Sequence, residues 1–106
     1  MNWLRSLFGF DPIFGGVPRS SKWPSVRKGY IALHPKCAVC GTKSDCEVHH
    51  IHPYHLHPEL ELNLHNLITL CRKDHYLFGH LNDWSSFNDS VESDSAIWNV
   101  KIEKRP

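Results

Sequence analysis

The sequence has no long hydrophobic run, and its mean hydropathy is −0.41. A helix needs about 20 consecutive apolar residues to cross a bilayer, so no segment is expected to span a membrane. The first ten residues carry Arg5 and lead to Asp11 and Pro12 without a small-residue cleavage site, which predicts that there is no signal peptide. The two absences predict a cytoplasmic protein without a membrane partner.

An excess of charge of either sign is also absent, because 12 basic and 11 acidic side chains leave a net charge of +1. The basic residues are nevertheless concentrated in the N-terminal third of the chain. Six basic side chains and one acid give residues 1–36 a charge of +5, whereas residues 37–80 and 81–106 each carry −2. This asymmetry fits a polyanion bound by the N-terminal third, and it fits an uneven solvated surface equally well.

Histidine is what the chain has in excess. Nine histidines occur among 106 residues, and eight of them lie between positions 49 and 80. The chain also has four cysteines. In a reducing compartment these predict a metal rather than disulfides, and zinc is a common staple for a domain with a small core.

The order of apolar runs and breakers predicts one α+β domain over residues 1–106. Its expected parts are an irregular arm (1–18), a core (19–84) and a C-terminal helical part (85–106). Within it we expect a helix at 23–33, a strand at 47–51, a long loop at 52–65, a strand at 66–70, a helix at 72–78 and a helix at 90–104.

Three expectations concern packing. The last helix is expected to bury Ile97, Trp98 and Ile102. Trp23 and Trp84 are expected in the core rather than as stacking platforms. Cys46, which has no spacing partner, is expected to pack in the core as well.

The other three cysteines have metal-ligand spacing. Cys37-Ala-Val-Cys40-Gly41 has the form of a zinc knuckle, and Cys71 follows after the second strand. A tetrahedral zinc needs a fourth ligand within one helical turn of Cys71. Both Asp74 and His75 satisfy that condition.

His49 and His50 are adjacent on a predicted strand, so their side chains face opposite ways. One can therefore face a metal while the other reaches a substrate. Asn66 at the head of the second strand and His75 on the following helix complete the pattern.

These residues together resemble the HNH endonuclease family, whose fold is the ββα-metal motif with a zinc knuckle and flanking helices. The resemblance runs from about Arg19 to Trp84. It rests on Ser-Ser-Lys-Trp-Pro-Ser-Val-Arg, Cys-Ala-Val-Cys-Gly, Glu-Val-His-His-Ile-His-Pro, Asn-Leu-Ile-Thr-Leu-Cys and Asp-His-Tyr-Leu-Phe-Gly-His. The stretch Pro-Glu-Leu-Glu-Leu is similar to a bacterial and phage subgroup.

The resemblance implies a role for each matching residue. His50 corresponds to the general base, and Asn66 to the residue that holds its ring. His49 and His75 correspond to ligands of one catalytic divalent ion, which could be Mg, Mn, Ni or Zn. The structural zinc would take Cys37, Cys40, Cys71 and Asp74, where relatives commonly have cysteine in place of the aspartate.

A second register remains open. His75 lies four residues after Cys71 and could complete the zinc site, which would leave His80 for the catalytic ion. His75 and His80 are about 140° apart on an α-helix, so they could share one ion only if the helix broke near Gly79.

The implied activity is hydrolysis of DNA phosphodiester bonds, by nicking or by double-strand cleavage. Duplex DNA with little sequence preference is the expected partner of a monomer or homodimer. Phosphate contacts are expected from five basic residues: Arg27, Lys28, Lys43, Arg72 and Lys73. The alternative is a zinc-stapled module that binds nucleic acid without cutting it.

Overall fold

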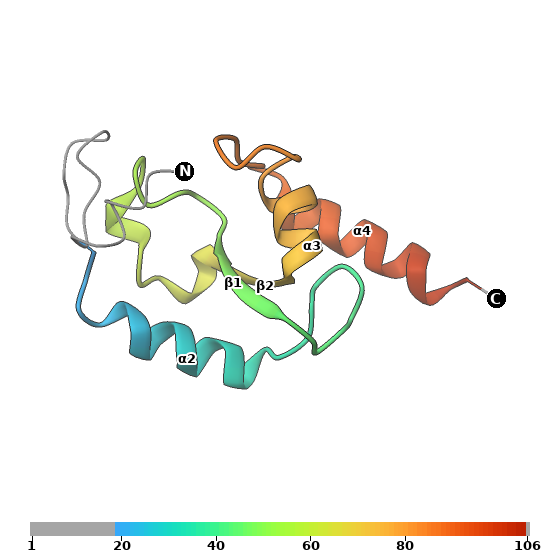
Figure 1. The fold of residues 1–106 in the computed structure, drawn as a ribbon, viewed down its shortest axis with the longest axis horizontal. Coiled ribbons are helices and arrows are strands. Elements are labelled where there is room, and N and C mark those ends of the chain that lie inside the picture. Colours follow the sequence, from blue (N-terminus) through green and yellow to red (C-terminus); the bar gives the residue numbers. More distant parts are fainter. Residues whose placement is uncertain (1–18, 106) are drawn as a thin grey trace.

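A computed structural model describes residues 19–105, so the irregular arm expected at 1–18 lies outside the described part. Four main elements follow one another in Figure 1: α2 (Trp23–Leu33), the strands β1 (Cys46–His50) and β2 (Leu67–Cys71), and α4 (Val91–Glu103). The short α3 (Arg72–Asp74) joins β2 to a single π turn, η4 (His75–Gly79). The small α+β fold is confirmed. No helix in the described range is long and apolar enough to cross a membrane.

The two strands form an antiparallel pair in which His49 faces Ile68 and His50 faces Leu67. All five residues of β2 are buried, as its branched and apolar sequence predicts. Figure 1 shows α2 on one side of the strands and the helices α3 and α4 on the other. The strands therefore separate two environments, and each strand residue faces one of them.

The core is small and lies between the strands, the cysteine knuckle and α4. Leu70 and Val91 are fully buried in it, and Cys37, Val39 and Ile51 join the same cluster. The partly buried Cys46 packs against this cluster, as expected. A core of this size contributes little stabilisation, so a bound metal ion would add much of the stability of the fold.

The helix after β2 differs from the sequence prediction in a way that matters for the site. The His80 N–H donates to the His75 carbonyl at 3.1 Å, which is the i→i+5 bond of a π turn. On a regular α-helix these two histidines would point about 140° apart. The wider π turn brings both side chains to the same face.

Two packing expectations are wrong. Ile97 and Trp98 of α4 are 54% and 43% exposed, and the helix buries Val91 and Ser95 instead. The reason is a polar anchor: the Asn99 side chain donates to the Val39 carbonyl at 3.0 Å and fixes which face of α4 meets the core. Ile102 does pack against the core.

Trp84 is the second correction, since it is 53% exposed rather than in the core. It lies in the turn before α4, where its ring packs on the rings of His75, Tyr76 and His80. Trp23 is half-buried and packs on His50 rather than in the main cluster.

Candidate active site and metal centres

The first cluster joins the knuckle to the end of β2. Cys37 and Cys40 come from the knuckle, where Gly41 closes the turn with a φ of +77°, a conformation that favours glycine. Cys71 ends β2, and Asp74 follows one turn later. Asp74 Oδ2 lies 3.2 Å from Cys37 Sγ and 3.3 Å from Cys71 Sγ, and the Sγ atoms of Cys40 and Cys71 are 3.9 Å apart.

These positions fit a tetrahedral zinc. All four cysteines are free thiols. With Zn–S bonds of about 2.3 Å, two tetrahedral sulfur ligands lie roughly 3.8 Å apart. Burial raises the pKa of the Cys71 thiol to about 12, and it also raises that of Cys37. Without a metal these thiols stay protonated at neutral pH and donate to the Asp74 carboxylate, and a divalent metal that bound here would displace their protons.

The second cluster consists of His49, His75 and His80. His49 Nδ1 lies 3.0 Å from His75 Nε2, which is 3.3 Å from His80 Nε2. Tetrahedral ligands at the Zn–N distance of about 2.0–2.1 Å would be roughly 3.3 Å apart. The structure therefore groups Asp74 with the cysteines and His75 with the histidines, and it brings His75 and His80 to one site.

The hydrogen bonds of these rings support a metal at that point. His75 Nδ1 bonds to Glu47 Oε1 at 2.9 Å, and His80 Nδ1 bonds to the Ser86 carbonyl at 2.8 Å. Since a carboxylate and a carbonyl only accept, both Nδ1 atoms carry the hydrogen. The two Nε2 lone pairs then face each other, an arrangement that a bound cation would stabilise.

His49 is the most buried of the three. It is 4% exposed, and its Nε2 has no hydrogen-bond partner among the described residues. Burial, together with the neighbouring histidines, lowers the pKa of His49 to about 2. The ring is therefore neutral at physiological pH, which is the form that binds a metal. Gly79 lies directly against it, because a Cβ there would be 3.0 Å from His49 Cε1.

His50 faces the other side of β1, toward α2, as strand alternation predicts. Its ring packs on the Trp23 ring with centroids 4.4 Å apart. Its Nε2 lies 2.9 Å from the Glu61 carbonyl, so Nε2 carries the hydrogen and Nδ1 is left with its lone pair. Burial lowers the pKa of His50, and the bond to the carbonyl partly offsets this effect.

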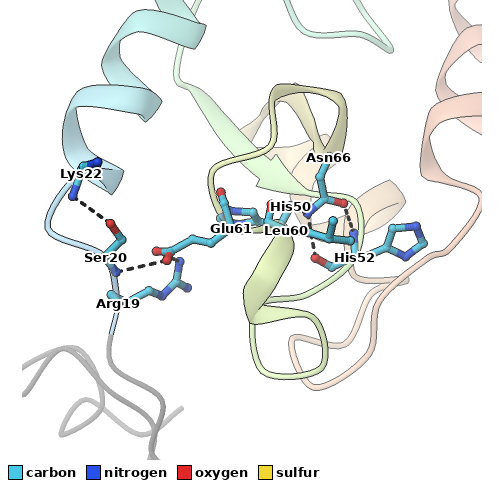
Figure 2. Close-up of polar contacts among 8 residues, drawn as sticks. All are labelled: Arg19, Ser20, Lys22, His50, His52, Leu60, Glu61 and Asn66. Carbon is cyan, nitrogen blue, oxygen red and sulfur yellow. Dashed lines mark hydrogen bonds and ion pairs between the residues drawn. The ribbon is translucent and has the colours of Figure 1, made fainter.

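The hydrogen bonds of Asn66, the residue expected to hold the His50 ring, go to the backbone of the loop between the strands. Its Oδ1 accepts from the His52 N–H at 2.8 Å, and its Nδ2 donates to the carbonyls of His52 and Leu60 at 3.1 and 3.3 Å. Figure 2 shows these bonds closing the loop between the strands. Asn66 thus fixes the backbone beside Glu61, whose carbonyl holds His50.

The five basic residues expected to contact phosphate are all exposed. Arg27 and Lys28 lie on α2, whereas Arg72 and Lys73 begin α3 next to the histidine cluster. Arg72 and Lys73 line a shallow open groove of about 700 Å³ with Tyr76 and Trp84. Arg72 also lies 3.7 Å from Glu47.

Sequence reasoning missed two carboxylates. Glu47 bonds His75, and the alternation of β1 could have revealed it because Glu47 and His49 are two residues apart on one strand face. Glu61 is buried in the loop that holds His50. No periodicity marks a loop residue of this kind, so local residue patterns contain no signal for it.

Comparison with known proteins agrees with this geometry. Residues 37–77 match the family model described as HNH endonuclease. No curated protein and no solved structure matches the chain. The matched segment contains the cysteine cluster, His49, His50, Asn66 and His75, and it ends before His80. Residues 37–77 of this chain are thus similar to the HNH endonuclease family, in agreement with the resemblance of the sequence motifs.

Proposed function

We propose that the protein is a metal-dependent endonuclease that hydrolyses phosphodiester bonds in DNA. The observation that carries the proposal is the convergence of His49, His75 and His80, with His50 next to His49 on β1. His50 is held through Nε2, which leaves the Nδ1 lone pair to accept a proton, and it is the chain neighbour of His49, the most buried member of that cluster. A base beside a divalent-ion site is what phosphodiester hydrolysis requires.

His50 would act as the general base. Its Nδ1 accepts a proton from the water that attacks phosphorus, and the bond from phosphorus to the leaving oxygen breaks as the new P–O bond forms. The Glu61 carbonyl holds Nε2–H and so fixes the tautomer that this step needs. The lowered pKa of His50 keeps the ring unprotonated at neutral pH.

His49, His75 and His80 would hold the catalytic ion, which would supply Lewis-acid stabilisation of the charge that develops on the phosphate. Glu47 holds His75 in orientation through Nδ1, and the Ser86 carbonyl does the same for His80. Three protein ligands leave room for substrate oxygen and water. Mg, Mn, Ni and Zn are the ions to compare.

Cys37, Cys40, Cys71 and Asp74 would bind a structural zinc. Four protein ligands close a tetrahedral site, so no position is left for substrate. This ion would tie the knuckle to the end of β2 and the start of α3. The role is therefore to support the fold from which the histidines project.

The test is nicking of supercoiled plasmid by the zinc-loaded protein with each divalent ion in turn. His50→Ala should lower the rate by about 10²–10⁴-fold, the usual contribution of a general base. His65→Ala removes an exposed histidine from the segment between β1 and β2 and should leave the rate unchanged. If the folded, zinc-loaded wild type is inert with every ion, or if His50→Ala cuts equally well, the non-cutting binding module replaces this proposal.

A further inference from the structure

Glu61 is a buried carboxylate outside both clusters of candidate metal ligands. It is 5% exposed, and its side chain reaches the segment just before α2. The Ser20 N–H donates to Glu61 Oε1 at 3.1 Å, and Arg19 lies 3.6 Å from Oε2. The Arg19 guanidinium in turn lies 4.3 Å above the Tyr54 ring. A buried carboxylate is costly unless it is paired, so these contacts hold the residue in place.

The backbone of the same residue holds the proposed base. The Glu61 carbonyl accepts from His50 Nε2–H at 2.9 Å, and the preceding carbonyl, that of Leu60, accepts from Asn66 Nδ2 at 3.3 Å. Figure 2 shows Glu61 between these two sets of contacts, with its side chain directed toward Arg19 and Ser20. The carbonyl that meets the His50 ring is thus fixed by Asn66 on one side and by the Glu61 carboxylate on the other.

We infer that Glu61 is a positioning residue for His50. Its carboxylate, held by Arg19 and Ser20, fixes its own carbonyl against the His50 ring and so maintains the Nε2–H tautomer with Nδ1 free. The segment before α2 thereby becomes part of the active-site support, together with Trp23, which packs on the same ring. The catalytic consequence of this inference rests on the proposed function, whereas the tautomer does not.

The kinetic test compares Glu61→Ala and Glu61→Gln with wild type. Glu61→Ala should lower kcat about 10–100-fold, the usual cost of losing an outer-shell partner, with KM for DNA unchanged. Glu61→Gln keeps an acceptor for the Ser20 N–H and should recover much of the loss. The matched control is Glu59→Ala, which removes an exposed carboxylate from the short helix η2 (Pro58–Leu60) just before Glu61 and should leave kcat unchanged. A wild-type kcat in Glu61→Ala would overturn the inference.

A double variant separates positioning from general support of the fold. If Glu61 acts only through His50, Glu61→Ala should cause no further loss of residual activity in a His50→Ala background. A further loss as large as in the wild-type background would overturn the inference, because it would mean that Glu61 acts elsewhere.

A spectroscopic test does not depend on activity. Nitrogen-15 NMR of the zinc-loaded protein should show His50 as the Nε2–H tautomer, and in Glu61→Ala a mixture of the two tautomers. An unchanged tautomer in Glu61→Ala would overturn the inference even if that variant were slow. If Glu61→Ala does not fold, Arg19→Ala, which alters a partly exposed partner, should produce the same change to a smaller extent, and an unchanged tautomer there counts against the inference. Should the wild type prove inert with every ion, the proposed function fails while this measurement still decides the role of Glu61.

Discussion

The two clusters of metal-ligating residues differ in charge and in access. The cysteine cluster combines three sulfurs and a carboxylate, and three of its four members are buried. The histidine cluster consists of imidazoles alone, and two of its three members are partly exposed. With a divalent ion bound, thiolates and a carboxylate leave a net negative site, whereas neutral imidazoles leave a positive one. Only the second would attract a phosphate.

The division between the clusters runs through consecutive residues. Asp74 ends α3 and faces the cysteines, whereas His75 begins η4 and faces the histidines. One short helical segment therefore links a closed site suited to stability with an open site suited to chemistry. The two sites therefore share a scaffold, but substitutions in them should have different consequences.

The largest expected effect is loss of the closed site. Cys40 is exposed although it belongs to the cluster, so Cys40→Ser should act through the metal rather than through core packing. Zinc contributes about 10–16 kcal/mol of apparent folding free energy in small zinc domains, against a typical total of about 5–15 kcal/mol. We expect Cys40→Ser to abolish cooperative thermal unfolding measured by circular dichroism.

Cys46→Ser is the control, because Cys46 lies outside the cluster and contacts the Thr42 carbonyl. It should unfold cooperatively with its zinc content intact. If both substitutions abolish cooperative unfolding, the loss in Cys40→Ser cannot be assigned to the metal site.

A smaller effect should separate the open site from the fold. Gly79→Ala places a Cβ about 3 Å from the His49 ring. Displacement of that ring should weaken divalent-ion binding and nicking about 10–100-fold, while overpacking costs about 1–3 kcal/mol of stability. Titration calorimetry on the zinc-loaded protein and a plasmid assay would measure both.

Gly29→Ala makes the same chemical change on α2, where a new Cβ meets nothing within 4 Å. It should stabilise the helix by about 0.5–1 kcal/mol without changing ion binding. Undiminished ion affinity in Gly79→Ala would mean that His49 does not serve the open site.

The next prediction concerns pH. Only unprotonated His50 can act as a base, so a lowered pKa should keep nicking active at more acidic pH than an ordinary imidazole would allow. Trp23→Ala exposes the His50 ring to water, which should raise its pKa and move the acid limb of the rate profile to higher pH. Nicking rates between pH 5 and pH 8 would show the shift, and Trp98→Ala on α4 should leave the limb in place. If the acid limb of the rate profile does not move in Trp23→Ala, packing of Trp23 on the His50 ring is not what lowers the pKa of His50.

The smallest expected effect concerns the charge beside the open site. Arg72→Ala and Lys73→Ala should each lower the slope of log affinity against log salt by about 1 if each contacts one phosphate. Lys101→Ala removes an exposed charge from α4, where Lys101 lies 5.0 Å from the Trp98 ring, and should not change the slope. Fluorescence anisotropy with a labelled duplex at several salt concentrations would measure it. Equal salt-dependence slopes in all three variants would mean that Arg72 and Lys73 of α3 do not contact the DNA phosphates.

Much of the local structure could be read directly from residue patterns. The helix Trp23–Leu33 ends where His34-Pro35 predicts, and the strands differ from their predicted bounds by one residue. The opposite facing of His49 and His50 follows from the two-residue period of a strand. These features depend on neighbours in the chain, which is why composition and spacing reveal them.

Contacts between distant segments could not be read in this way. Asn99 bonds to Val39 and turns the face of α4 that the apolar pattern favours away from the core. The choice between Asp74 and His75 as partner of the cysteines depends on where α3 changes into a π turn, and both residues have acceptable spacing. The same turn brings His80 beside His75.

The sequence by itself determined the residue types of two clusters that could hold a metal, the strand on which His49 and His50 face apart, and the HNH pattern. Only the tertiary structure decided which donors converge, that Asn66 bonds the backbone of the loop, and that Glu61 joins His50 to the segment before α2. The physical reason is distance along the chain. Periodicity reports the direction of a side chain relative to its neighbours, whereas convergence of residues from different segments of the chain depends on how the elements pack.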